Sequence, residues 1–130
     1  WNENLSVKVA EIDRQHQKLI AIINDLTDAI QRGKGNAVIG EIVRGLGDYA
    51  KVHFETEEKY FKQFGYPEAA RHLKEHEVFI QKVKGFETGT PKSKFSLSIQ
   101  VMQFLGDWLI NHILGTDKEY SAFFNEKGLK

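Results

Sequence analysis

The sequence predicts an all-α protein, an antiparallel up-down four-helix bundle with an N-terminal extended arm and a short C-terminal helix. Apolar residues recur at spacings of three and four over four segments, which is typical of amphipathic helices. The loops between these segments are short, and short loops favour antiparallel neighbours. A length of 130 residues suits one hydrophobic core, so we expect residues 1–130 to form a single domain.

The first helix is expected from Asp13 to Arg32, with Gly33 at the position of a C-terminal cap. The second is expected to begin after Asn36, a candidate N-cap, and to stop at Phe64 and Gly65. Three glycines weaken the first half of the second helix, by up to about 1 kcal/mol each. They are Gly40, Gly45 and Gly47.

The third helix is expected to start at Tyr66 and Pro67, since proline suits the first helical position, and to reach Gly85. Residues 86–92 contain two threonines, a glycine and a proline and form the clearest predicted loop. The fourth helix is expected to open at Ser93 or Lys94, and its broad apolar face extends to the last histidine of the chain.

Two predicted elements lie outside the four helices. Residues 1–12 alternate loosely between apolar and polar, so we expect an extended arm packed across the bundle. Residues 117–124, which follow Gly115, predict a short terminal helix.

Composition excludes several classes of function. With 18 basic and 18 acidic residues the net charge is zero, which argues against a nucleic-acid or anionic-membrane partner. The absence of cysteine excludes disulfides, thiolate zinc sites, iron–sulfur clusters and covalent c-type haem. The longest apolar stretches, such as residues 19–23, are far shorter than the ~20 residues that cross a bilayer. We therefore expect a cytoplasmic protein.

All five histidines fall into a pattern that can hold a pair of metal ions. His72 and His76 are four residues apart, so on a helix they point side by side into the same space. The same spacing places Glu57 beside His53, and His16 is expected on the inward face of the first helix. Imidazole is a common ligand of transition metals, and carboxylates can bridge two cations.

His112 and Asp117 do not follow this spacing, because five steps of an ideal α-helix rotate by about 140°. If the helix ends or bulges near Gly115, Asp117 can turn back toward the bundle interior. We therefore predict irregular backbone between His112 and Asp117. The alternative is that Asp117 simply caps the terminal helix.

Each of these residues also has an ordinary alternative when taken alone. A single histidine on a helix is most often a surface or hydrogen-bonded residue, and Glu57 could belong to an acidic face with Glu55 and Glu58. Chance explains the joint pattern poorly, because it places every histidine inward on four helices with a carboxylate on two of them. The sequence therefore predicts metal binding.

The segments around these residues resemble the hemerythrins, in particular the bacterial hemerythrin-like domains called bacteriohemerythrins. The matching segments cover nearly the whole chain, and no ligand position of the family is missing. They are residues 9–16, 53–58, 72–79 and 108–120.

The resemblance implies two non-haem iron ions bridged by an oxo or hydroxo group and by Glu57 and Asp117. One iron would then have three imidazoles and the other two, which leaves one position open for dioxygen. The implied ligands are His72, His76 and His112 for the first iron, and His16 and His53 for the second. Four residues next to ligands in sequence are candidate walls of the oxygen pocket, although ordinary core packing would explain them equally well. They are Phe54, Trp108, Leu109 and Ile113.

The expected function is reversible dioxygen binding for storage, delivery or sensing, rather than enzymatic catalysis, with weak oxidase activity left open. One alternative is a di-iron redox enzyme that reduces oxygen, peroxide or nitric oxide. Another is a sensory module from a chemotaxis-type receptor, so the recipient would be an oxygen-consuming enzyme or a signalling domain. A structural zinc site is the weakest alternative, since zinc usually takes four ligands without bridges. No histidine has a glutamate three residues before it, unlike the ferritin-like oxidases.

Overall fold

The computed structural model describes residue 1, residues 3–88 and residues 94–130, and the described part is helical almost throughout. The elements in chain order are a 3-10 turn η1 (Glu3–Leu5), α1 (Ala10–Gln31), α2 (Gly35–Phe64), α3 (Ala69–Thr88), α4 (Lys94–Trp108), a π-helix η2 (Leu109–Asp117) and α5 (Lys118–Glu126).

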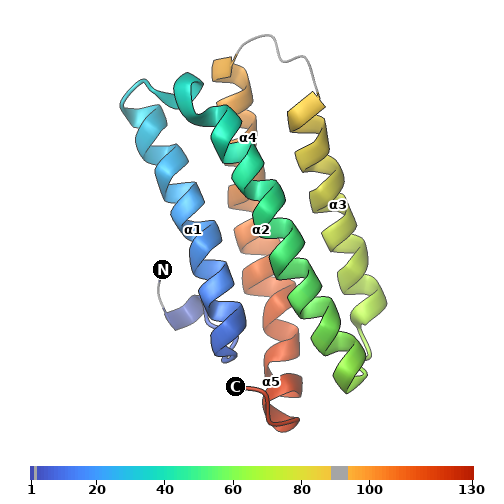
Figure 1. The fold of residues 1–130 in the computed structure, drawn as a ribbon. Coiled ribbons are helices and arrows are strands. Elements are labelled where there is room, and N and C mark those ends of the chain that lie inside the picture. Colours follow the sequence, from blue (N-terminus) through green and yellow to red (C-terminus); the bar gives the residue numbers. More distant parts are fainter. Residues whose placement is uncertain (2, 89–93) are drawn as a thin grey trace.

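Four long helices lie side by side, and helices that follow one another in sequence run in opposite directions (Figure 1). Helix α2 contacts α1, α3 and α4. Helix α4 continues through η2 into α5 without a loop, so the C-terminus lies at the same end of the bundle as the N-terminus (Figure 1). The prediction of an antiparallel four-helix bundle with a short C-terminal helix is confirmed.

The N-terminal arm is shorter than predicted, because α1 begins at Ala10 rather than at Asp13. Asp13, in the first turn of α1, binds the arm through two hydrogen bonds. One oxygen of its carboxylate accepts a hydrogen bond from the Ser6 hydroxyl at 2.5 Å, and the other accepts one from the Val7 N–H at 2.8 Å. The Ser121 hydroxyl donates to the Val7 carbonyl at 2.6 Å, which ties the arm to α5.

Two of the predicted helix ends are confirmed. Gly33 and Gly65 follow α1 and α2 with φ of 73° and 67°, a left-handed conformation that glycine adopts without steric cost. The predicted cap at Asn36 is wrong. Helix α2 already begins at Gly35, and its N-cap residue Lys34 makes no side-chain hydrogen bond.

Helix α3 begins at Ala69, two residues after Pro67, which lies in the preceding turn. It also continues past Gly85 to Thr88, so the predicted loop is wrong at residues 86–88. The rest of that loop, and Ser93 as a helix start, lie outside the described residues.

Two hydrophobic clusters fill the bundle. The larger one lies among the four long helices and contains residues such as Leu46, Phe79 and Leu105. The smaller one joins the arm to α5 and the adjoining ends of α1 and α2, and it comprises Val7, Val9, Ile12, Phe61, Tyr66, Tyr120 and Phe124. None of the helices in the described part combines the length and the hydropathy that a bilayer crossing requires.

Candidate metal centre

Four helices deliver seven polar side chains to one place inside the bundle. Each of these residues is at most 2% exposed, although charged and polar groups are seldom fully buried. They are His16 from α1, His53 and Glu57 from α2, His72 and His76 from α3, and His112 and Asp117 from η2.

The π-helix explains how His112 and Asp117 can face the same point. A π-helix pairs residue i with residue i+5, so residues five apart lie about one turn apart. Nε2 of His112 is therefore 3.0 Å from Oδ1 of Asp117. The predicted irregular backbone between these residues is confirmed, and the alternative role of Asp117 as an N-cap is wrong, because its side chain makes no capping hydrogen bond.

The seven side chains divide into two overlapping groups. In each group, the potential ligand atoms all lie within 4.8 Å of one another. The group that we call the three-histidine set contains His72, His76, His112, Glu57 and Asp117. The two-histidine set contains His16, His53, Glu57 and Asp117. Both carboxylates are thus shared between the sets, as bridging ligands would be.

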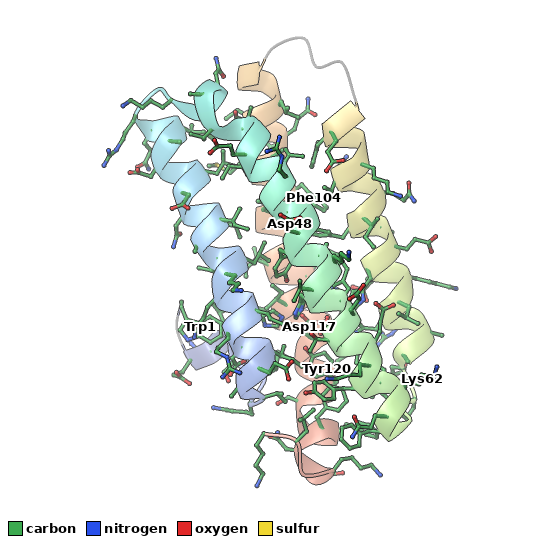
Figure 2. All side chains as sticks on the ribbon, viewed as in Figure 1. Trp1, Asp48, Lys62, Phe104, Asp117 and Tyr120 are labelled. Carbon is green, nitrogen blue, oxygen red and sulfur yellow. The ribbon has the colours of Figure 1, made fainter. Side chains whose placement is uncertain are left out.

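Asp117 contacts imidazoles of both sets. Its Oδ1 lies 2.8 Å from Nε2 of His72 and 3.0 Å from Nε2 of His112. Its Oδ2 lies 3.0 Å from Nε2 of His16. Figure 2 shows Asp117 inside the half of the bundle that is nearer to α5, with Tyr120 further along toward the C-terminus.

Glu57 makes the corresponding contacts from α2. Its Oε1 lies 3.1 Å from Nε2 of His53 and 3.0 Å from Nε2 of His76. Its Oε2 lies 3.7 Å from Nε2 of His72. Asp117 therefore reaches the two sets with different oxygens, whereas one oxygen of Glu57 reaches both sets.

Many of these buried atoms lack a hydrogen bond despite their short separations. Among the described residues, neither oxygen of Glu57 or of Asp117 has a hydrogen-bond partner. The same holds for Nε2 of His72, His76 and His112. Unpaired buried polar atoms cost free energy, and a cation placed among their lone pairs removes that cost. Five imidazoles and two carboxylates form a donor set that suits transition-metal ions, so the residues fit a pair of metal ions.

Without metal, the two carboxylates lie close enough to His72 to change the pKa of its imidazole. Burial alone would lower the pKa of His72, but Asp117 and Glu57 raise this pKa to about 10. Burial and the charge of Glu57 would raise the pKa of Asp117, but the neighbouring histidines, His112 above all, hold it below its ordinary value. A metal ion must therefore displace protons from the imidazoles when it binds.

Aromatic rings cover the three-histidine set. The ring of Phe54 lies flat on His76, with centroids 3.8 Å apart and planes at 6°. Trp108 lies on His112 in the same way, with centroids 3.9 Å apart and planes at 15°. The other two predicted pocket residues belong to the same hydrophobic core, Ile113 fully buried and Leu109 partly buried.

Two polar residues that the sequence did not single out contact Nδ1 atoms of the clustered imidazoles. Nδ1 of His53 lies 2.7 Å from the amide oxygen of Gln15. Nδ1 of His112 lies 3.1 Å from a carboxylate oxygen of Glu75. Each partner comes from a different helix than its histidine, so only the packing of the helices reveals the pair. The available signal was that Gln15 and Glu75 each directly precede another histidine of the cluster.

Tyr49 is a further neighbour of the cluster that the sequence did not single out. Its ring stacks on His53, with centroids 5.1 Å apart and planes at 19°. Its hydroxyl is buried and has no hydrogen-bond partner among the described residues. Burial, followed by the charges of Asp117 and Glu57, raises the pKa of Tyr49 well above its ordinary value. The spacing of four residues between Tyr49 and His53 could have indicated this contact.

The arrangement agrees with a known family. A family model described as the hemerythrin HHE cation binding domain matches residues 7–124. The chain belongs to the hemerythrin family. All seven clustered side chains lie within the matched region.

Individual relatives extend the same similarity. The chain is 34% identical over 121 residues to a bacteriohemerythrin of Stenotrophomonas maltophilia, an alignment that covers 93% of this chain and 78% of the relative. It is 32% identical over 127 residues to a bacteriohemerythrin of Clostridium acetobutylicum, covering 92% and 96%. It is also 31% identical over 122 residues to a hemerythrin-like protein of Naegleria gruberi, covering 94% and 90%.

Proposed function

We propose that residues 1–130 form one hemerythrin-like di-iron domain that binds dioxygen reversibly, for oxygen storage, delivery or sensing. The buried cluster of five imidazoles and two shared carboxylates, in a member of the hemerythrin family, is the observation that supports this proposal. The iron ligands would be His72, His76 and His112 on one ion and His16 and His53 on the other, with Glu57, Asp117 and an oxo or hydroxo group as bridges.

The unequal sets suggest where dioxygen binds. The two carboxylates are shared by both sets, so an ion held by the two-histidine set would have one protein donor fewer than an ion held by the three-histidine set, and dioxygen would bind there. A bound pair of ferrous ions would supply the two electrons that reversible dioxygen binding needs. The protein's contribution is to fix the ligands and to exclude water.

The surroundings of the cluster favour binding over turnover. The seven residues are almost completely buried, and the ring of Phe54 lies against His76 of one set and His53 of the other, with centroids 3.8 Å and 5.8 Å apart. In our proposal Phe54, Trp108, Leu109 and Ile113 form walls of the oxygen pocket. A dry apolar pocket limits the entry of water and protons that would convert bound oxygen irreversibly. We therefore propose an oxygen-binding protein rather than an enzyme.

The recipient of the oxygen and the cellular location stay predictions from the sequence. An oxygen-consuming enzyme or a signalling domain would serve as recipient, and the cytoplasm as location. Cell fractionation followed by detection of the protein tests the location directly.

An oxygen cycle followed by visible absorption tests the proposed function. The iron-loaded protein is reduced without air, exposed to oxygen, and then flushed with inert gas. We expect a charge-transfer band that appears with oxygen and disappears when oxygen is removed, over repeated cycles. Irreversible conversion to the diferric form with continued oxygen consumption would instead identify an oxidase.

Zinc-loaded protein is the matched control for the cycle, because zinc has no redox chemistry. It should show no oxygen-dependent band. Iron analysis of the same sample should give two ions for each chain, and a value of one would contradict the proposed pair.

A further inference from the structure

Only some of the proposed ligand imidazoles have a hydrogen-bond partner at Nδ1 among the described residues. Among the described residues, Nδ1 of His16, His72 and His76 has no hydrogen-bond partner. His53 and His112 do have one, and they belong to different sets, one to the two-histidine set and the other to the three-histidine set. Each set therefore has one histidine whose orientation a second side chain fixes.

On the two-histidine side, a chain of hydrogen bonds orients a neutral amide. The Thr56 hydroxyl donates to the Val52 carbonyl at 2.9 Å, so its oxygen is free to accept. The Gln15 amide N–H donates to that oxygen at 3.0 Å. The amide oxygen of Gln15 is thereby turned toward Nδ1 of His53, 2.7 Å away. His53 must carry its proton on Nδ1, which leaves Nε2 free to bind a metal.

On the three-histidine side, the acceptor is a carboxylate. Oε1 of Glu75 lies 3.1 Å from Nδ1 of His112 and also accepts a hydrogen bond from the Thr116 hydroxyl at 2.9 Å. The Glu75 side chain is 34% exposed, whereas His112 is buried. His112 is therefore held as an Nε2 ligand too, but by a partner that carries negative charge.

This difference makes the two metal positions chemically unequal. A carboxylate that accepts the Nδ1 proton raises the basicity of an imidazole more than an amide does. A more basic imidazole donates more electron density to its metal and favours the ferric state. We propose that Gln15 and Glu75 are positioning residues that set the order of oxidation, so that the ion in the three-histidine set loses its electron before the ion in the two-histidine set. This inference rests on the proposed di-iron site.

Exchanging the two acceptors tests the proposal. The diferrous protein is titrated without air with ferricyanide, which takes one electron from one iron at each step. We expect Gln15→Glu to lower the mean midpoint potential of the two steps and Glu75→Gln to raise it. Both substitutions preserve the shape of the side chain, and both should bring the two steps closer together.

Two charge controls separate hydrogen bonding from general electrostatics. Gln17→Glu adds the same charge to α1 at an exposed position two residues from Gln15. Glu58→Gln removes the same charge from α2 next to Glu57, at a half-buried position. Each control should shift the potential much less than its matched exchange.

A second measurement does not depend on iron chemistry. Zinc affinity of the metal-free protein is measured by competition with a coloured chelator. Removal of a partner behind a ligand imidazole typically weakens metal binding by about 10- to 100-fold, so we expect Gln15→Ala and Glu75→Ala to lose affinity in that range. Helix content, followed by circular dichroism, shows that the variants remain folded.

The outcomes distinguish the inference from the proposed function. If the exchanges bind two irons but shift the potential in the same direction, or no more than their controls, Gln15 and Glu75 do not set the order of oxidation. If the unaltered protein does not bind two irons, the proposed function fails. In that case unchanged zinc affinity in Gln15→Ala and Glu75→Ala would also overturn their positioning role.

Discussion

His76 shows how one side chain can serve both core packing and a proposed metal site. Its Nε2 lies 3.0 Å from Glu57, while its ring lies flat on Phe54 at 3.8 Å between centroids. The same contact that fills the core therefore fixes the direction of the nitrogen. A ligand placed by packing of this kind needs little reorganisation when a metal binds.

The His76→Ala substitution should empty one metal position. It removes one of the three nitrogens of the three-histidine set and leaves His16 and His53 untouched, so we expect iron content to fall from two ions toward one for each chain. Iron analysis after reconstitution checks this. Glu77→Ala, at an exposed position on the same helix, is the control and should retain both ions. Full retention in His76→Ala would contradict the ligand assignment.

At the scale of the helices, η2 is the element on which the centre depends most. Asp117 supplies oxygens to both sets, yet it lies five residues after His112. In an α-helix that step would turn Asp117 away from His112 by about 140°. The π-helix between Leu109 and Asp117 returns Asp117 to the same face, and α5 continues from there.

Changing the length of η2 by one residue in each direction should have unequal effects. Deletion of Gly115 gives a four-residue step from His112 to Asp117, which an ordinary α-helix turns by only about 40°. Insertion of one alanine after Gly115 moves Asp117 off the face that the π-helix provides. We expect the deletion to keep most of its metal affinity and the insertion to lose the bridging carboxylate. The zinc affinities of the two metal-free variants measure this difference. Equal losses of affinity would show that the direction of the Asp117 side chain does not determine metal binding.

Helical geometry alone predicts contacts within one helix, but it does not predict which side chains of two different helices touch. His72 and His76 are four residues apart, so helical geometry alone places them on one face. The irregular backbone before Asp117 was predictable for the same reason, because an ideal α-helix would turn Asp117 away from His112 by about 140°. Pairs such as Gln15 with His53 depend on how two helices are packed against each other, which periodicity does not report. The start of α1 also differed, since Asp13 acts as the anchor of the arm and not as the first helical residue.

For the molecule as a whole, the polar cluster lies between two apolar ones. The larger hydrophobic cluster contacts the polar cluster through Phe54 and Trp108, which stack on His76 and His112. From the other end, the ring of Phe61 lies 4.8 Å from His72 and that of Tyr120 lies 5.5 Å from it. The fold thus buries ionisable groups at its centre, and its stability must depend on their protonation and on metal.

The pH dependence of stability should therefore differ between the metal-free and the iron-loaded protein. The pKa of His72 is about 10 in the metal-free fold against an ordinary value of 6.5. Its contribution is fully present below pH 6.5 and is lost as the pH rises toward 10. We expect the unfolding free energy of the metal-free protein to fall by an amount on the order of a few kcal/mol over that range. Iron-loaded protein has no proton on Nε2 of His72 to lose, so its unfolding free energy should not show this decline. Urea unfolding at pH 6.5 and 9.5, with and without bound iron, measures the difference, and parallel declines in both forms would show that His72 is not a ligand.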